Sequence, residues 1–195
     1  MTVRAVVPLK PLRNAKSRLS AVLSPAERRA LALDMAEHVV GVLLQVVDEV
    51  FLLGSTALPA YPELPCLKDS GGGLNRALDR AIDALPHTSG DILLVVAGDL
   101  PLLGVLDVKA LVAAAEAGVA LAPDRARTGT NALGLRSPRD FRFRFGSRSC
   151  EAHTAEAARV GASCEVIARS GLALDVDDAD SLEAFRTLRL PTSPV

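Results

Sequence analysis

Short apolar runs alternate with longer segments of helical periodicity along the whole 195-residue chain. The runs are predicted strands and the longer segments predicted helices, and their alternation is typical of a mostly parallel β-sheet covered by helices. No internal repeat, linker or low-complexity tract interrupts the pattern. We therefore predict an α/β fold with a single domain and three layers (α/β/α), in which helices lie on both sides of a mostly parallel sheet.

Element boundaries follow from the apolar periodicity and from turn residues. The expected strands cover residues 3–9, 49–53, 65–68, 92–97, 119–122, 132–136, 165–167 and 172–174. The expected helices cover residues from 25 onward, 74–85, 107–117, 149–160 and 179–188. Ser24, Pro25 and Glu27 form a capping-box sequence at the first helix, and Gly118 is the expected C-cap of the third. The tail from about residue 190 is expected to be loose.

Composition limits the class of protein. Hydrophobic residues make up 49% of the chain and aromatic residues only 3%, with no Trp, so the core must consist of Ala, Val and Leu. The formal net charge of -1 argues against general affinity for nucleic acid. Three scattered cysteines without a C-x-x-C pattern, and no apolar stretch long enough for a membrane, predict a cytoplasmic protein without membrane association.

Aspartates stand where two of the apolar runs end: Asp99 follows residues 92–97, and Asp175 and Asp177 close residues 172–174. Strand ends converge on one edge of an α/β sheet, where ligands bind. A turn or a helix N-cap explains Asp99 and Asp177 equally well. Asp175 is harder to explain, because period two in a strand puts it on the same face as Asp177, and like charges repel unless a cation compensates them. Mg²⁺ prefers such carboxylates, supplemented by waters and substrate phosphates.

Four basic residues crowd the loop after the first expected strand, and no acidic residue follows them before Glu27. They are Lys10, Arg13, Lys16 and Arg18. Taken alone, this is most simply a solvated basic loop. At the same sheet edge as the aspartates it becomes a clamp for a triphosphate, because Mg²⁺ together with Lys and Arg neutralises charge on transferring phosphoryl groups.

Three polar loops are candidates for holding substrate. Residues 69–75 are rich in glycine but lack the G-K-[ST] ending of a P-loop. They form either a simple turn, with Asn75 as the cap of the next helix, or a segment whose backbone approaches a base and ribose closely. Residues 127–131 offer two hydroxyls and an amide, and residues 146–149 precede a helix whose N-terminus presents backbone donors. Both are either ordinary turns or a site for a phosphorylated acid.

Arg and Phe alternate over residues 141–145. We interpret this segment as a strand or hairpin with Phe inward and Arg outward, or as a subunit contact, ahead of a substrate clamp and well ahead of a nucleic-acid platform. The three histidines, His38, His87 and His153, show no metal-ligand spacing. No G-x-S-x-G elbow or Cys/His pairing supports hydrolysis through a covalent intermediate.

Several strings, in order along nearly the whole chain, resemble the CofC-type guanylyltransferases of deazaflavin coenzyme F-420 biosynthesis. They are Val7-Pro-Leu-Lys10, Ala15-Lys-Ser-Arg-Leu19, Asp69 with Gly73-Leu-Asn75, Asp99-Leu-Pro-Leu-Leu103, Thr128-Gly-Thr-Asn-Ala-Leu133, Phe145-Gly146 with Ser149, and Gly171-Leu-Ala-Leu-Asp-Val-Asp177. The resemblance implies a nucleotide-diphospho-sugar-transferase-like (Rossmann-like) fold. It also implies transfer of GMP from GTP to a three-carbon phospho-acid (phosphoenolpyruvate, 2-phospho-L-lactate or 3-phospho-D-glycerate), with release of pyrophosphate.

The same resemblance implies roles for individual residues. The implied ligands of two Mg²⁺ ions are Asp99, Asp175 and Asp177, and the implied catalytic residues are Lys10, Lys16 and Asp99. The implied nucleotide-binding residues are Pro8, Lys10, Lys16, Arg18, Asp69, Gly73, Leu74 and Asn75. The implied acceptor-binding residues are Thr130, Gly146 and Ser149, while Arg148 either reads the substrate carboxylate or faces water. A homodimer is also favoured.

The residue inventory agrees with this chemistry. The attacking phosphate monoester is already largely dianionic at neutral pH, with a second pKa of roughly 6, so it needs no general base. Transfer requires instead that repulsion between two polyanions is cancelled and that the groups align at the α-phosphorus. Two alternatives stay open: a nucleotidyltransferase related to the molybdenum-cofactor guanylyltransferases with another acceptor, and a non-catalytic module that senses a nucleotide or Mg²⁺.

Overall fold

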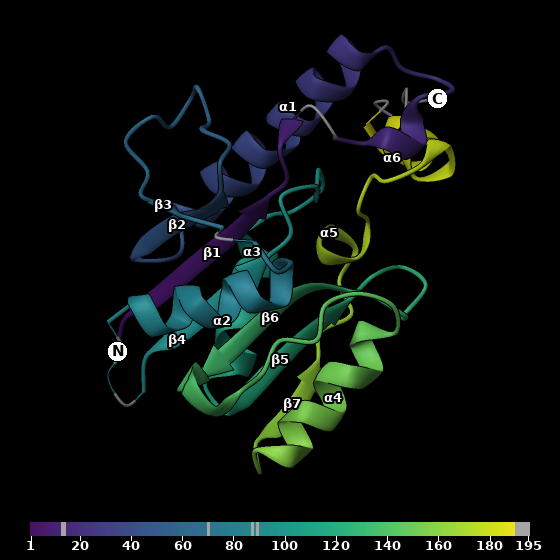
Figure 1. Ribbon diagram of the computed structural model, residues 1–195. Helices are drawn as coiled ribbons and strands as arrows, with labels where there is room; N and C mark the ends of the chain where they lie inside the picture. Colours follow the sequence, from purple (N-terminus) through teal and green to yellow (C-terminus); the bar gives the residue numbers. More distant parts are fainter. Residues whose placement is uncertain (13–14, 70, 87, 89, 190–195) are drawn as a thin grey trace.

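The computed structural model describes residues 1–12, 15–69, 71–86, 88 and 90–189 (Figure 1). Arg13, His87 and the tail from residue 190 lie outside the described residues, and so do the predictions made for them. Within the described part of the chain, no helix combines the length and the apolar character needed to cross a membrane.

Seven strands form one sheet within the described residues, in the order β3-β2-β1-β4-β6-β5-β7. The strands are β1 (Val3–Leu9), β2 (Glu49–Gly54), β3 (Cys66–Leu67), β4 (Ile92–Val96), β5 (Gly118–Pro123), β6 (Thr130–Arg136) and β7 (Ser163–Val166). β6 is antiparallel to β4 and β5, while the other pairs are parallel. Because β6 runs in reverse, its first residues lie beside the carboxyl end of β4, where Ala97 N donates to Asn131 O (2.9 Å).

Helices cover both faces of the sheet (Figure 1). They are α1 (Pro25–Leu43), α2 (Leu74–Ala84), α3 (Val105–Ala115), α4 (Ser149–Arg159), α5 (Ser170–Ala173) and α6 (Ala179–Arg189), with 3-10 turns η2 (Ser17–Leu19) and η3 (Pro138–Asp140). α1 and α3 pack on one face, and α2 and α4 pack on the other. α6 packs against η2 and α1 through Leu182 and Phe185. The predicted three-layer α/β/α arrangement with a mostly parallel sheet is confirmed.

The centre of the core is β4, whose residues are all buried. Ile92, Leu94 and Val96 face the layer of α1 and α3, and the two residues between them face α2 and α4. Burying an aliphatic side chain of this kind stabilises the fold by about 1.5–3 kcal/mol. The continuous apolar run that predicted a central strand therefore reflects two buried faces.

The predicted capping box is confirmed. Ser24 Oγ accepts from Glu27 N (3.3 Å) and the Glu27 carboxylate accepts from Ser24 N (2.8 Å). These two bonds satisfy backbone donors that have no partner inside the helix.

The prediction of a strand at residues 172–174 is wrong, because the segment forms the short helix α5 and then an extended stretch outside the sheet. The amide of Asn131 donates to the carbonyls of Leu172 (3.0 Å) and Ala173 (3.2 Å), so a side chain satisfies these groups where a neighbouring strand was expected. Asp175 and Asp177, which follow, therefore lie on the same side of the chain without being part of a strand.

Smaller corrections concern element ends. Gly118 is the first residue of β5 and not a C-cap, and α3 ends at Ala115. A Cβ at Gly118 would lie 2.7 Å from the Ser163 carbonyl oxygen, so the glycine permits the close approach of β7. β7 begins two residues before the predicted strand, and β6 begins at Thr130, inside the predicted polar loop.

The Phe/Arg segment, residues 141–145, forms neither a strand nor a hairpin. Its alternation is nevertheless as predicted, because Phe141 and Phe143 are buried while Arg142 and Arg144 are exposed. The segment packs on α2 and α4 without forming a ladder with the sheet, so its period of two comes from burial alone.

Candidate active site

A cavity of about 580 Å³ opens at the carboxyl ends of β1 and β4. Nine of the predicted site residues line it: Pro8, Lys10, Lys16, Arg18, Asp69, Leu74, Asp99, Thr130 and Asp177. They come from the end of β1 and the loop after it, the loop between β3 and α2, the start of α2, the residues after β4, the start of β6 and the segment before α6. The fold thus gathers residues that are far apart in the sequence around one space.

The ammonium of Lys16 joins two of the aspartates. Its Nζ lies 2.5 Å from Asp99 Oδ2 and 2.9 Å from Asp177 Oδ1, and its side chain is only 7% exposed. Burial by itself would lower the pKa of Lys16, but the two carboxylates outweigh it and the pKa is raised. Lys16 has a left-handed backbone (φ 51°), a conformation that costs energy for a residue other than glycine. The ammonium therefore stays charged between the two acids.

Further positive charge faces Asp177. Burial would raise the pKa of Asp177, but Lys16, and beyond it Lys10 and Arg18, hold this pKa below its usual value. The basic loop and the aspartates therefore meet at one edge of the sheet, as predicted.

Asp175 is half-buried, between the buried Leu174 and Val176. It accepts a hydrogen bond from the Asn131 amide (3.2 Å), and burial, followed by the nearby charge of Asp99, raises its pKa. Val176 is buried and donates its backbone N–H to Asp99 O (3.3 Å), which fixes the segment beside the end of β4. Within the described residues, however, no three His, Cys, Asp or Glu side chains are arranged so that they could hold a metal ion.

At the start of α2, Leu74 lines the cavity, whereas Gly73 and Asn75 are not part of the lining. Gly73, the N-cap of the helix, has a φ of 88°, and a Cβ there would meet nothing within 4 Å, so the backbone is open to a ligand. Leu74 exposes its side chain. The Asn75 amide, by contrast, is engaged with Phe145, since it donates to the carbonyl oxygen (3.0 Å) and accepts from the backbone N–H (2.8 Å). Asn75 thus joins the predicted nucleotide loop to the segment that precedes Gly146.

The start of α4 lies near Thr130. Ser149, the first residue of α4, is buried and donates its backbone N–H to Gly146 O (3.2 Å). Cys150 N donates to Thr128 O (3.1 Å), which ties the helix to the loop before β6. Thr130 lines the cavity, whereas Gly146 and Ser149 do not.

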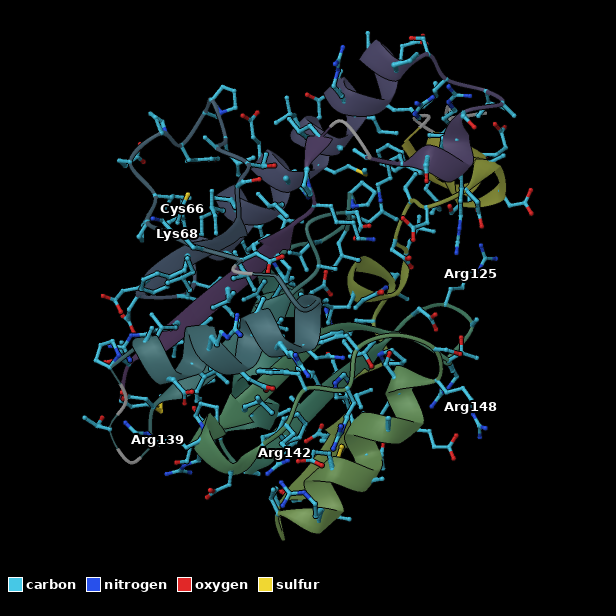
Figure 2. All side chains as sticks on the ribbon, in the orientation of Figure 1. Cys66, Lys68, Arg125, Arg139, Arg142 and Arg148 are labelled. Atoms are coloured by element: carbon cyan, nitrogen blue, oxygen red, sulfur yellow. The ribbon has the colours of Figure 1, made fainter. Side chains whose placement is uncertain are left out.

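Arg148 points away from this region. Its side chain is 76% exposed, pairs with Glu151 and extends from the edge of the molecule (Figure 2). It lies outside the cavity lining and faces water, which is one of the two alternatives that the sequence left open.

Three residues of this region make contacts that the sequence did not predict. Asn131 holds both Asp175 and the end of α5, Phe145 is bound by Asn75, and His153 bonds to Thr130. His153 has no metal-ligand spacing, so that signal does not reveal it. A usable signal was its position four residues after Ser149, which places both on the same face of a helix.

Comparisons with known proteins cover nearly the whole chain. The protein-family model described as "Guanylyl transferase CofC like" matches residues 3–186. The phosphoenolpyruvate guanylyltransferase of Sphaerobacter thermophilus is 40% identical over 190 residues, which are 94% of this chain and 92% of that protein. The proteins of the same name from Rubrobacter xylanophilus and Chloroflexus aggregans are 38% and 36% identical, over 93% and 95% of this chain and 92% and 97% of theirs.

Solved structures share the fold at low sequence identity. A nucleotidyl transferase from Methanothermobacter has a TM-score of 0.68 at 15% identity, over 98% of this chain and 99% of that one. A structure from Desulfovibrio desulfuricans, named for the nucleotide-diphospho-sugar transferases, has a TM-score of 0.78 at 15% identity, over 99% and 90%. The expected nucleotide-diphospho-sugar-transferase-like fold is confirmed.

Proposed function

Because the chain belongs to the CofC-like guanylyltransferase family, we propose that it transfers GMP from GTP to phosphoenolpyruvate with release of pyrophosphate. Membership of the family makes it a GTP-dependent nucleotidyltransferase of coenzyme F-420 biosynthesis that uses a phospho-acid. The proposal concerns which phospho-acid. The relatives at 36–40% identity are named for phosphoenolpyruvate, which favours it over 2-phospho-L-lactate and 3-phospho-D-glycerate.

One observation carries the proposed chemistry: the Lys16 ammonium lies between Asp99 (2.5 Å) and Asp177 (2.9 Å) at the wall of a cavity that Lys10 and Arg18 also line. Positive and negative charge alternate there over a few ångströms. Such an arrangement suits a ligand that carries both a metal cation and a polyphosphate.

Mg²⁺ is the proposed cofactor, with Asp99 and Asp177 as ligands and Asp175 beside them. The donor set fits, because Mg²⁺ in phosphate-transfer sites is usually held by one or two carboxylates, while waters and substrate phosphates complete the shell. A cage of three protein ligands is therefore not required before the nucleotide binds. The raised pKa of Asp175 marks a carboxylate whose ionised form would gain from a nearby cation. When bound, Mg²⁺ would neutralise charge on the phosphoryl oxygens.

The reaction forms one bond and breaks one. A phosphate oxygen of the acceptor attacks the α-phosphorus of GTP, and the bond from that phosphorus to the bridging oxygen of the β-phosphate breaks. Pyrophosphate leaves with the bonding electron pair, and the product is a phosphoanhydride. Lys10, Lys16 and Arg18 lower the repulsion between the two anions, and no side chain has to remove a proton.

Two ends of the cavity receive the two substrates in this proposal. The nucleoside lies against the wall of Pro8, Asp69, Gly73, Leu74 and Asn75. The phospho-acid lies toward Thr130, on the side of the cavity that leads to the turn from Gly146 to Ser149.

The test is product analysis with three acceptors. The protein is incubated with GTP, MgCl₂ and either phosphoenolpyruvate, 2-phospho-L-lactate or 3-phospho-D-glycerate, and pyrophosphate release is followed with mass spectrometry of the product. We expect release with phosphoenolpyruvate and a product that contains GMP joined to it. Preference for another acceptor would overturn the substrate assignment, and no release with any of the three would overturn the function.

Dimerisation and the absence of nucleic-acid binding stay predictions. Light scattering checks the first. Filter binding with single-stranded RNA at low salt checks the second. Arg139 and Arg142 are exposed and are the residues to replace if RNA binds (Figure 2).

A further inference from the structure

A buried histidine lies behind the proposed acceptor end. The side chain of His153, on α4, is fully buried (0% exposed). Its Nδ1 lies 3.0 Å from Thr130 Oγ1, and its Nε2 accepts a 2.9 Å hydrogen bond from the backbone N–H of Arg144. Thr130 lines the cavity and His153 does not. The histidine therefore meets substrate only through the threonine.

The backbone contact decides which ring nitrogen carries hydrogen. A backbone N–H can only donate, so Nε2 is the unprotonated nitrogen of the ring. A neutral His153 then carries its hydrogen on Nδ1 and donates it to Thr130 Oγ1. The hydroxyl hydrogen of Thr130 is not used in this contact and is available to another acceptor.

The surroundings keep the ring neutral. Phe141 stacks on it (5.9 Å between ring centres) and Phe145 contacts it edge to face (4.7 Å). Burial lowers the pKa of His153 to about 4, and the charged groups that face it, Glu156 and Arg144, act in opposite directions. The aromatic residues of the Phe/Arg segment thus form a dry pocket around the ring.

We infer that His153 is a positioning residue, which makes the Thr130 hydroxyl a dedicated hydrogen-bond donor to an anionic oxygen of the acceptor substrate. The inference rests on the proposed function, because the anion is the phosphate or carboxylate of the phospho-acid. Ionised oxygens of this kind accept hydrogen bonds and have no hydrogen to donate. If His153 carried its hydrogen on Nε2, Thr130 would have to donate to Nδ1 and would offer the anion only lone pairs.

The tautomer is tested on the wild-type protein. Long-range ¹H–¹⁵N correlation spectra of histidine-labelled protein distinguish the two neutral tautomers and the imidazolium, and the signal missing from His153→Gln assigns the residue. We expect the Nδ1–H tautomer at neutral pH. An Nε2–H tautomer or an imidazolium would overturn the inference. Since this readout needs no turnover, it fails or succeeds independently of the pyrophosphate assay that tests the proposed function.

Two substitutions separate positioning from packing. In His153→Asn the amide nitrogen occupies the place of Nδ1 and still donates to Thr130, whereas His153→Gln reaches the place of Nε2 and loses that donor. We expect His153→Gln to raise the KM for the acceptor at least about tenfold, the effect of losing one hydrogen bond to a charged group. In His153→Asn the KM for the acceptor should rise clearly less, and the KM for GTP should change little in both variants. Equal losses in the two variants would mean a structural role and would overturn the inference.

A double variant adds a coupling test. Thr130→Val removes the hydroxyl, and we expect His153→Gln to raise the acceptor KM no further in that background, because both changes remove one donated hydrogen bond. Effects that multiply would show that the two residues act independently and would count against the inference.

Discussion

Carboxylates lie at both ends of β4, and the protein holds them in different ways. Before β4, Asp91 accepts hydrogen bonds from the backbone N–H groups of Thr88 (3.0 Å) and Thr2 (2.8 Å) and pairs with Arg4 (3.2 Å). These donors, the backbone of Thr88 first, hold the pKa of Asp91 well below its usual range. After β4, Asp99 and Asp177 share one lysine ammonium, and Asp175 has a raised pKa.

The two ends differ in whether the donors around the carboxylates can be replaced by a ligand. The backbone N–H groups that bind Asp91 are fixed by the fold, so they cannot move away from it. The ammonium of Lys16 is carried on a flexible side chain, so a metal ion can take its place beside Asp99 and Asp177 while the ammonium turns to a phosphate. An aspartate at either end of the same strand thus has a structural or a functional use according to the donors around it.

Replacing one carboxylate should give the largest difference in activity between the two ends of β4. Asp99→Asn and Asp177→Asn are each expected to lower kcat/KM for GMP transfer by about 100- to 1,000-fold, because electrostatic groups at the reacting phosphate contribute on that scale. The melting temperature should fall less than in a variant that removes Lys16, because the ammonium keeps one of its two carboxylates. Steady-state pyrophosphate release and a melting curve measure the two quantities.

The matched control is Asp91→Asn. It should lower the melting temperature, because an amide replaces the acceptor of three hydrogen bonds, and leave kcat/KM within about twofold, as expected for a distant and independent position. If Asp91→Asn lost as much activity as Asp99→Asn, the distinction between the two ends would fail.

The second-largest effect is expected when Lys16, the replaceable counter-ion of the two aspartates, is removed. Lys16→Met should lower the free energy of unfolding by about 2 kcal/mol in the absence of metal, less than for a fully buried pair because Asp177 is partly in water. MgCl₂ should restore part of this loss, because the metal ion supplies the missing positive charge. Urea unfolding with and without MgCl₂ measures it.

Arg4→Met is the control at the other end. Arg4 pairs with Glu49 and Asp91, so this variant should also be destabilised, but without any recovery in MgCl₂. Equal recovery of both variants would indicate a general ionic effect and no metal site beside Asp99.

Stability should also depend on pH through His153. The folded pKa of about 4 lies below the ordinary value of 6.5, so between these values the unfolded chain binds the proton more readily. Stability is therefore complete above about pH 6.5 and falls as the pH decreases toward 4, by about 1.4 kcal/mol at pH 5.5. Urea unfolding at several pH values measures the slope, and His153→Gln should remove this part of it. An unchanged slope in that variant would place the titration elsewhere.

The smallest effect concerns the tie between the two substrate walls. Asn75→Ala removes both hydrogen bonds to the Phe145 backbone, which contribute about 1 kcal/mol each. We expect about half of this total to be felt at the acceptor end, so that the KM for the acceptor rises about fivefold. Steady-state kinetics with varied acceptor measure it. Gln45→Ala, which removes an exposed hydrogen bond from the side-chain amide to the Gly41 carbonyl near the end of α1, should leave that KM unchanged.

How far the sequence predicts this molecule depends on how local each signal is. The capping box at Ser24 and the buried run at β4 were predictable because neighbouring residues determine them. The meeting of the basic loop with Asp99 and Asp177 was predicted from the general rule that strand ends converge. The antiparallel direction of β6 was not, because pairing direction depends on distant contacts, and so Thr130 and Asn131 were assigned to a loop.

The segment around Asp175 illustrates the same limit. Its apolar alternation predicted a strand, but the amide of Asn131 satisfies the carbonyls of α5 in the place of a neighbouring strand. Burial of Val176 still leaves the two aspartates on either side of it directed to the region of Asp99. Period two was thus the right pattern with a different structural cause.

Binding of a divalent ion tests the central claim most directly. Mn²⁺, which suits the same oxygen ligands as Mg²⁺, is titrated in the presence of GTP and followed by electron paramagnetic resonance. Wild type and Asp91→Asn should bind it alike, while Asp99→Asn and Asp177→Asn should each bind at least about tenfold more weakly. Equal Mn²⁺ binding by all four proteins would contradict a metal site built from these two distant aspartates.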